Sequence, residues 1–229
     1  MNLQTALGLT LGLVFLAGSG CATNPTPPAA QTSLAREGIR DISTTIEPII
    51  ARAKIPGMVA VVLNCDRIIA QGAAGVRKRG DSTPITIDDQ FLLCSATKAM
   101  TATLAAMAVD EGKLSWSSTL GASLPEIAPQ MHPDWKTVTL AQLLAHRAGV
   151  PATGDSFWNS LRAHFSSASA AEKRRTIVAK TLARAPSYPP GSRYVYADID
   201  YIIVGAMLEA ISGRSWEDLI RENSGNRSG

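Results

Sequence analysis

"CSATKAMTATLAAMAVDEGKL", residues 94–114, predicts a long helix whose first turn carries a lysine. Alanine, methionine and leucine lie on every side of this helix from Ala96 to Val109, and Gly112 is a natural end. A helix that is apolar all round is expected to be buried. Lys98 would then lose water, and desolvation lowers the pKa of a lysine toward neutrality.

Ser95 lies three residues before Lys98 and therefore on the same face of the first turn. The two side chains can share a hydrogen bond, with Lys98 as base and Ser95 as nucleophile. The free N–H groups and positive dipole at a helix start favour developing negative charge. In the alternative interpretation Ser95 caps the helix and the Lys98 amine extends to solvent. Because Ser-x-x-Lys also occurs by chance, the flanking sequence must decide between the two.

A helix and a hairpin are predicted ahead of this stretch. Residues 34–55 place isoleucines at helical spacing and end before Pro56–Gly57, which predicts an amphipathic helix. Residues 58–64 (MVAVVLN) and 67–76 (RIIAQGAAGV) are typical of two antiparallel strands joined at Cys65–Asp66. The predicted order is helix, hairpin, then the long helix.

The N-terminus predicts export. Its apolar core, residues 6–17, is shorter than the roughly 20 residues that span a bilayer and matches a secretory signal. The segment ending at Cys21 resembles a bacterial lipobox, whose cysteine is lipidated, and ordinary cleavage is the alternative. We expect a signal peptide over residues 1–21 and a Pro/Thr/Ala-rich linker over 22–33. The domain over 34–229 would then be periplasmic or anchored to the membrane through Cys21.

Three cysteines are present in the chain. If Cys21 is acylated, Cys65 and Cys94 remain as an even pair in an oxidising compartment. Their spacing gives no sign that they are close enough to bridge, so two small buried side chains are the favoured interpretation. No patterned base accompanies Cys94, which argues against a thiol nucleophile.

Composition narrows the possible classes of function. The chain has 229 residues, 45% hydrophobic and 18% charged, which is enough for one sizeable core. Its formal net charge is +3, and its basic residues are scattered along the sequence, so no nucleic-acid partner is expected. Three widely spaced histidines lack acidic or cysteine partners at ligand spacing, and the glycines form no phosphate-binding motif. We therefore expect neither a metal nor another cofactor.

Four segments of the chain are similar, in the same order, to four motif regions of one known family. They are residues 55–76, 84–120, 138–151 and 188–220. In that order they resemble the opening hairpin, the Ser-x-x-Lys segment, the Leu-Leu-x-His-x-x-Gly loop and the Tyr-x-Asn region of one family. This family is the serine penicillin-recognising hydrolases, which comprise class C β-lactamases, D-alanyl-D-alanine carboxypeptidases and related esterases.

The resemblance implies roles for further residues. Tyr196 holds the place of the tyrosine that lies beside the nucleophile and moves its proton. His146 falls in the loop that borders the cleft, where it is expected to contribute to substrate binding. Asp198, which is also expected to contribute to substrate binding, stands where the family usually has asparagine. A carboxylate there would raise the pKa of Lys98 and oppose β-lactam turnover. Asp200 is expected to cap the apolar helix that follows it.

Family members also carry a Lys-Thr-Gly or His-x-Gly strand after the tyrosine motif. No residues after Asp198 show that pattern, and a polar, Gly- and Ser-rich tail replaces the expected apolar continuation. We therefore expect a truncated or frameshifted reading frame. The hairpin would then keep an unpaired edge and an uncovered apolar face.

Together these observations predict a mixed α/β fold of the β-lactamase and penicillin-binding-protein type. It would contain an antiparallel sheet flanked by helices, incomplete here, and a helical subdomain over residues 114–188. The predicted reaction is acyl-enzyme formation at Ser95 on an amide or ester, namely a β-lactam, a D-Ala-D-Ala peptide or a small ester. The alternative is a catalytically defective homologue, or a protein that binds peptidoglycan peptides or β-lactams without turnover. The oligomeric state is left open.

Overall fold

A computed structural model describes residues 38–64, 67–150 and 167–225 of the chain. These residues form two compact units, one ending at Leu92 and the other beginning at Leu93. The predicted signal peptide, the linker, Cys21 and Cys65 lie outside the described residues. Within the described part, every helix is too short or too polar to cross a bilayer.

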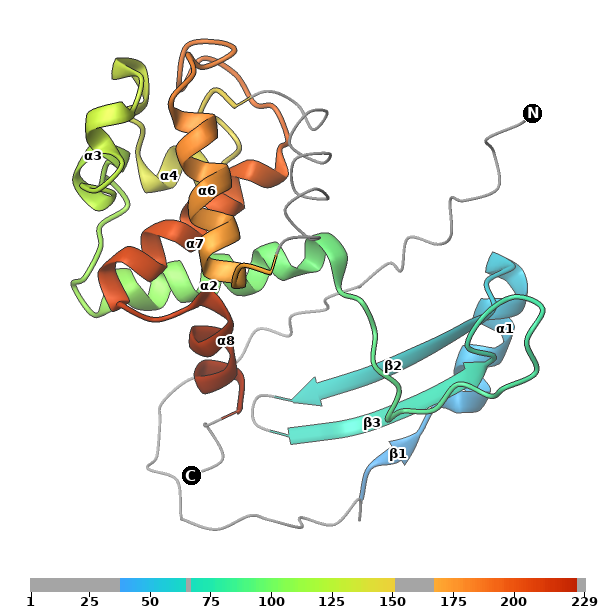
Figure 1. Ribbon diagram of the computed structural model, residues 1–229. Helices are drawn as coiled ribbons and strands as arrows, with labels where there is room; N and C mark the ends of the chain where they lie inside the picture. The colour runs from blue at the N-terminus through green and yellow to red at the C-terminus, as the bar shows by residue number, and fades with distance from the viewer. Residues whose placement is uncertain (1–37, 65–66, 151–166, 226–229) are drawn as a thin grey trace, which may run out of the picture. The chain divides into compact units, whose positions relative to one another are not determined.

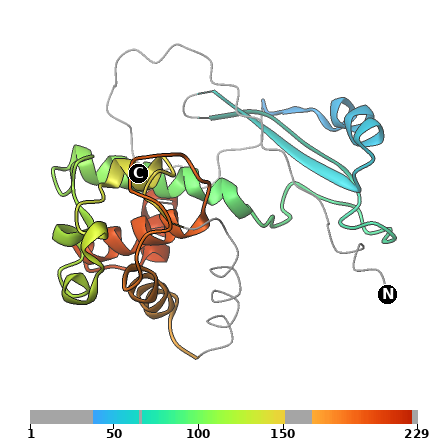
Figure 2. The ribbon, with the colours of Figure 1, turned by 90° about the horizontal axis from the view of Figure 1, so that it is seen from above.

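The first unit contains a three-stranded sheet with α1 (Ser43–Ala53) against one face (Figures 1 and 2). β3 is the central strand, paired in parallel with β1 and antiparallel with β2. The predicted hairpin is confirmed, since Val61 lies opposite Gln71 in the β2–β3 pairing. The strand bounds are β1 (Arg40–Asp41), β2 (Gly57–Asn64) and β3 (Arg67–Gly75).

α1 begins later than the sequence predicted. Residues 40–41 are a strand, and the backbone N–H and hydroxyl of Ser43 donate to Asp41 Oδ1 at 2.8 and 2.6 Å. A Cβ at Gly72 would lie 2.5 Å from the Ser43 nitrogen, so only glycine lets α1 approach β3 this closely. The expectation of a helix from residue 34 is therefore wrong at residues 40–42, because pairing with β3 overrides the local helical spacing.

Four large apolar side chains of the hairpin are exposed: Val61, Val62, Leu63 and Ile68. Leu63 alone is 68% exposed. Val61 and Val62 are neighbours on β2 and point to opposite sides of the sheet, so these side chains do not form one face, and the expected uncovered apolar face remains a prediction.

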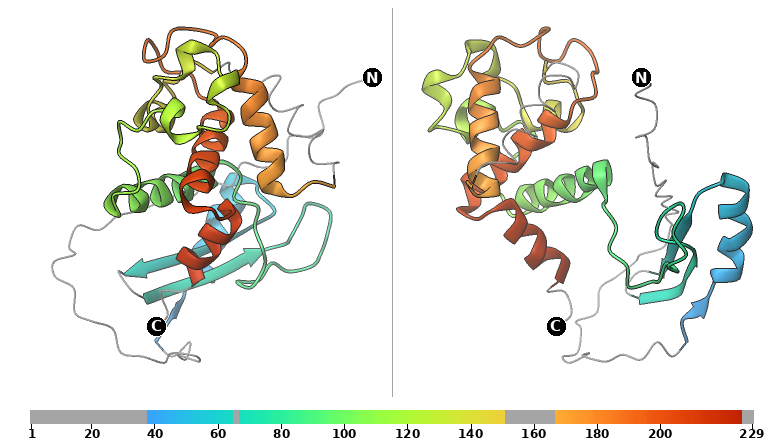
Figure 3. Two further views of the ribbon diagram at one scale, coloured as in Figure 1. Left: turned by 60° about the vertical axis from the view of Figure 1, so that its left-hand side comes forward. Right: turned by 45° about the vertical axis from the view of Figure 1, so that its right-hand side comes forward.

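The second unit is helical in its described part, and α6 lies side by side with α7 (Figure 3). Its core contains large, fully buried side chains from several helices and turns, among them Trp135, Leu143, Ile203 and Met207. The principal helices are α2 (Thr97–Asp110), α3 (Leu120–Ser123), α4 (Leu140–Leu144), α6 (Ala170–Leu182), α7 (Asp198–Ser212) and α8 (Trp216–Gly225).

α2 is buried on one side only. Thr101, Leu104, Ala105 and Ala108 are buried, whereas its other described side chains are half-buried or exposed. Because α7 and α8 pack against α2 along that side, the prediction of a helix buried all round is wrong for the described residues.

A capping box starts α4, the helix that leads to His146. Gln142 N–H donates to Thr139 Oγ1 at 3.2 Å, and Thr139 N–H donates to Gln142 Oε1 at 2.9 Å. We expect Thr139→Ala to lower the free energy of unfolding by about 1 kcal/mol, measured by urea denaturation. Thr103→Ala, at an exposed position inside α2, is the control and should change it by less than about 0.5 kcal/mol. Equal losses in the two variants would contradict a capping role.

Candidate active site

Ser95 sits in a single 3-10 turn, η1 (Cys94–Ala96), directly before α2. The turn is closed by Ala96 N–H, which donates to Leu93 O at 3.0 Å. The Lys98 amine donates to Ser95 Oγ at 3.2 Å, as the i to i+3 spacing predicted. The residue at the N-cap of α2 is Ala96, and no side chain caps the helix there. The interpretation of Ser95 as a capping residue is therefore wrong.

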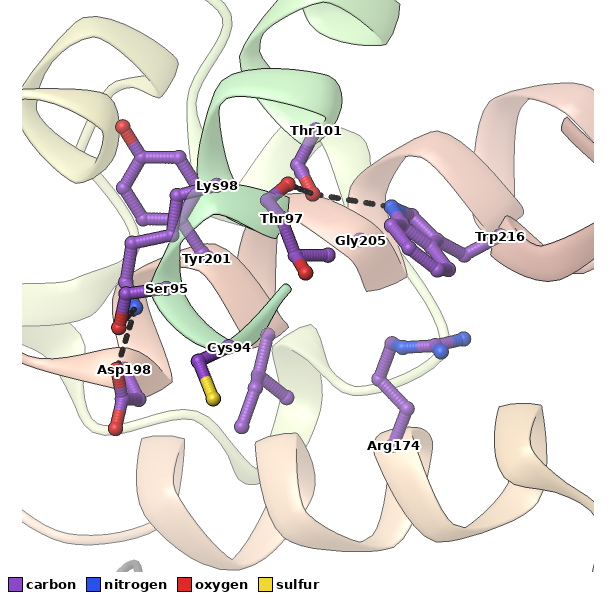
Figure 4. A pocket seen from close by; sticks show the side chains of 11 residues that line it. Cys94, Ser95, Thr97, Lys98, Thr101, Arg174, Asp198, Tyr201, Gly205 and Trp216 are labelled. Carbon is purple, nitrogen blue, oxygen red and sulfur yellow. Dashed lines mark hydrogen bonds and ion pairs between the residues drawn. The ribbon is translucent and has the colours of Figure 1, made fainter. Parts of the chain in front are cut away.

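Cys94 is exposed, so the prediction that it is a buried side chain is also wrong. Its φ angle of 48° places it in the left-handed region, which turns the chain just before Ser95. Its side chain consequently lines the same pocket as Ser95 (Figure 4).

Lys98 is held between Ser95 and a carboxylate. Its side chain is only 16% exposed, and its amine lies 2.5 Å from Asp198 Oδ1. Desolvation acts to lower the pKa of Lys98, but hydrogen bonds and charge interactions with Asp198 and Tyr196 outweigh it and raise that pKa above its ordinary value. The expected shift of the Lys98 pKa toward neutrality is therefore wrong, the expected rise caused by Asp198 is confirmed, and its effect on β-lactam turnover remains a prediction. The charged lysine also lies 4.9 Å from the centroid of the Tyr196 ring.

Tyr196 completes the contact with the serine. Its hydroxyl donates to Ser95 Oγ at 2.8 Å across 101 residues of sequence. Val195 N–H donates to His146 O at 2.9 Å and fixes the segment that carries this tyrosine. Tyr194 is 61% exposed and meets the His146 ring edge-on. Of the two alternating tyrosines, Tyr196 is thus the one beside the serine, as predicted.

Ser95, Lys98 and Asp198 line an open pocket of about 450 Å³, and Tyr196 is not among its lining residues (Figure 4). Ser95, Lys98 and Asp198 lie at one end of it, and Trp216 and Arg174 lie at the other. Trp216 Nε1 donates to Thr101 Oγ1 at 3.1 Å, which ties α8 to α2. Arg174 forms ion pairs with Glu209 and Glu217, so its charge is already neutralised by protein. Within the described residues, no three histidine, cysteine or carboxylate side chains are grouped as a metal site would require.

The structure gives His146 and Asp200 places that the sequence did not predict. His146 is buried and does not line the pocket, so its role as a substrate contact remains a prediction. Asp200 is fully buried in the first turn of α7 and contacts His146, so its expected role as a capping residue is wrong. A carboxylate inside an otherwise apolar helix was the available signal for this pair.

The contact between Lys98 and Asp198 gives a direct test of the charge state. We expect Asp198→Asn to lower the pKa of Lys98, because a neutral amide cannot stabilise the ammonium form while burial still opposes it. The measurement is an NMR titration of the Lys98 Cε signal. The control is Asp134→Asn, an exposed carboxylate elsewhere in the unit, which should leave the titration unchanged. A Lys98 midpoint that is the same in Asp198→Asn and wild type would show that Asp198 does not control the charge.

Comparisons with known proteins show the family of this chain. The Beta-lactamase family model matches residues 42–224. "Penicillin-binding protein 4" from Amycolatopsis lactamdurans is 29% identical over 168 residues, which cover 73% of this chain and 42% of the relative. A "Putative D-alanyl-D-alanine carboxypeptidase" from Escherichia coli K12 is 24% identical, over 73% of this chain and 40% of the relative. A solved class C β-lactamase superposes with a TM-score of 0.59 at 24% identity, over 77% of this chain and 45% of that chain.

The chain spans less than half of the length of these relatives. The matched range still holds the hairpin, the Ser95 turn with α2, and the Tyr196 segment with α7, in the order that the sequence predicted. Since one family model covers all of these elements, the chain belongs to the β-lactamase and penicillin-binding-protein family of serine hydrolases.

Proposed function

We propose that Ser95 attacks an amide or ester carbonyl and forms an acyl-enzyme, which water then hydrolyses. The observation that carries this proposal is the pair of hydrogen bonds at Ser95 Oγ, from Lys98 at 3.2 Å and from Tyr196 at 2.8 Å. Both donors are within the distance that proton transfer requires. The location of Ser95 just ahead of α2 adds the positive end of a helix dipole near the developing charge.

The proton of Ser95 needs an acceptor, and the charge state of Lys98 favours Tyr196. Because Asp198 holds Lys98 as an ammonium ion, the Tyr196 oxygen is the remaining group within hydrogen-bond distance of Ser95 Oγ that can exchange a proton with it. As the bond from Ser95 Oγ to the carbonyl carbon forms, the serine proton moves to the Tyr196 oxygen, and the Tyr196 hydroxyl passes its own proton toward the leaving group. The C–N or C–O bond then breaks, and the leaving group takes the proton. Water repeats the sequence to release the acid and regenerate Ser95.

The proposed substrates are β-lactams, D-Ala-D-Ala peptides of peptidoglycan, or small esters. The pocket supports a small substrate, since it is open beside Ser95 and has apolar surface from Ile202 and Trp216 farther along. The names of the relatives support the peptide and β-lactam classes. All three classes contain the carbonyl that the mechanism needs.

Covalent labelling tests the proposal. The chain is incubated with a fluorescent penicillin and, separately, with an activated p-nitrophenyl ester, and its intact mass is measured. We expect one adduct that maps to the tryptic peptide spanning residues 80–98 and, by fragmentation, to Ser95. Cys94→Ala is the matched control, because the Cys94 thiol lines the same pocket and is the rival nucleophile. This variant should keep the adduct. A folded chain that gives no adduct with either reagent, or an adduct on Cys94, would reject the proposal.

A second candidate is a protein that binds such compounds without turnover. The 2.5 Å ion pair between Lys98 and Asp198 favours it, because this pair takes the lysine out of use as a base. Time courses separate the two functions. An adduct that persists while one equivalent of product forms indicates binding without turnover, and continued product release indicates a hydrolase.

A further inference from the structure

A buried carboxyl group lies behind the candidate active site. Asp200 is 0% exposed, and its Oδ2 lies 2.8 Å from His146 Nδ1. Its second oxygen, Oδ1, is buried without a hydrogen-bond partner among the described residues. An ionised carboxylate left half-bonded in such a place would be strongly destabilising.

The hydrogen bonds around His146 Nδ1 show where the proton lies. Ala197 N–H points at this nitrogen from 3.4 Å, and a backbone N–H can only donate. An Nδ1 that accepts from Ala197 N–H presents its single lone pair, which leaves the proton of the 2.8 Å contact on Asp200 Oδ2 and makes the two donors share that lone pair. In agreement, burial raises the pKa of Asp200 to about 8, against a lowering effect from Lys98. Burial and the Lys98 charge also lower the pKa of His146, against a raising effect from Asp198.

His146 in turn supports the segment that carries the tyrosine. Its carbonyl accepts from Val195 N–H at 2.9 Å, its Nδ1 accepts from Ala197 N–H, and its ring centroid lies 4.6 Å from that of Tyr196. Three successive residues are thus attached to one histidine. The Tyr196 hydroxyl extends from this support to Ser95 Oγ.

We propose that Asp200 and His146 are positioning residues for the reaction at Ser95. Asp200, as a neutral carboxylic acid, donates to His146 Nδ1 and fixes the imidazole, and the imidazole holds Tyr196 with its hydroxyl at the serine. This inference rests on the proposed function. A neutral Asp200 adds no second negative charge near Asp198, which already balances the Lys98 ammonium.

Two substitutions separate the donated hydrogen bond from the carboxyl charge. Asp200→Asn keeps the shape and an N–H donor toward Nδ1, and it should acylate within about 5-fold of the wild type. Asp200→Leu fills a similar space without a donor, and it should acylate about 10- to 100-fold more slowly because Tyr196 is misplaced. Circular dichroism checks that each variant is folded. Equal rates in Asp200→Leu and wild type would overturn the proposal, as would an Asn variant as slow as the Leu variant.

A pH profile distinguishes positioning from a purely structural role. Wild-type acylation should decline above pH 8, where Asp200 ionises and stops donating, and Asp200→Asn should lack that decline. The other groups that face the pair are Lys98 from α2, Asp198 on α7, and the phenols of four tyrosines: Tyr188, Tyr194, Tyr196 and Tyr201. These remain in both proteins, so the difference between the two profiles isolates Asp200. Identical profiles would contradict the proposal.

Thermal unfolding follows the same proton without any substrate. The folded state binds this proton up to about pH 8, whereas the unfolded chain releases it near the ordinary aspartate pKa of 3.8, so wild-type stability declines with pH across that window. Asp200→Asn has no such proton. The Tm difference, variant minus wild type, should therefore rise from pH 4 to pH 8, and a constant difference would contradict a neutral Asp200.

NMR decides the inference even if the proposed function fails. Nitrogen-15 spectra should show His146 protonated at Nε2 and not at Nδ1, and a proton on Nδ1 would overturn the assignment. Cross-peaks between the His146 and Tyr196 rings should be present in wild type and Asp200→Asn and weakened in Asp200→Leu. A folded wild-type chain that forms no adduct with the penicillin or the ester would reject only the proposed function. Cross-peaks that are unchanged in Asp200→Leu would reject positioning.

Discussion

Ser95→Ala is expected to lower the rate of adduct formation by more than about 10³-fold, which amounts to complete loss in a labelling experiment. Ser95 Oγ is the atom that bonds to the carbonyl carbon, and neither Lys98 nor Tyr196 can act as the nucleophile in its place. The fold should be retained, because Ser95 is exposed and does not cap α2. The measurement is the time course of intact mass with a fluorescent penicillin and with an activated ester.

Ser117→Ala provides the matched control for this loss. Ser117 is an exposed serine with a hydrogen-bonded hydroxyl, outside the pocket, and its replacement should leave the labelling rate unchanged. An adduct that persists in Ser95→Ala would place the nucleophile elsewhere, with Cys94 as the first residue to examine because its thiol lines the same pocket.

The serine and lysine pair could be predicted from sequence because it is local. Three residues of helical spacing fix the Ser95 and Lys98 side chains on one face, whatever the rest of the fold does. Tyr196 lies 101 residues from Ser95, so no local rule joins them. That contact was predicted only because the order of motifs resembled a known family. The hairpin was likewise predictable from its two β-branched runs and the short turn between them.

The charge state of the site could not be predicted in the same way. The apolar surroundings of Lys98 indicated a lowered pKa, and Asp198 indicated a raised one. Only the 2.5 Å contact shows that the second effect is larger. Asp200 and His146 are 54 residues apart, and their pairing depends on how α4 and α7 pack. Long-range contacts of this kind decide which carboxylate is ionised, and no spacing rule in a single sequence reveals them.

The two carboxylates that follow Tyr196, Asp198 and Asp200, therefore have opposite roles. Asp198 is 47% exposed at the side chain, faces Lys98 and balances its charge. Asp200, two residues later, is fully buried, and burial raises its pKa to about 8. Helical geometry points the two side chains to different sides of the first turn of α7. One ammonium and one carboxylate are thus left beside the serine, and the tyrosine is the remaining group that can exchange a proton with it.

Tyr196→Phe is expected to slow acylation by about 10²- to 10⁴-fold, the usual contribution of a positioned acid–base group. The variant removes the hydroxyl that contacts Ser95 Oγ and keeps the ring that packs on His146, so the loss reports chemistry and not packing. Tyr194→Phe is the control, since that tyrosine is 61% exposed, and its rate should stay within about 2-fold of wild type. If Tyr196→Phe acylates as fast as wild type while Lys98→Met does not, the lysine is the base. The ion pair with Asp198 would then have to open before each reaction, and Asp198→Asn should accelerate acylation in the Tyr196→Phe background.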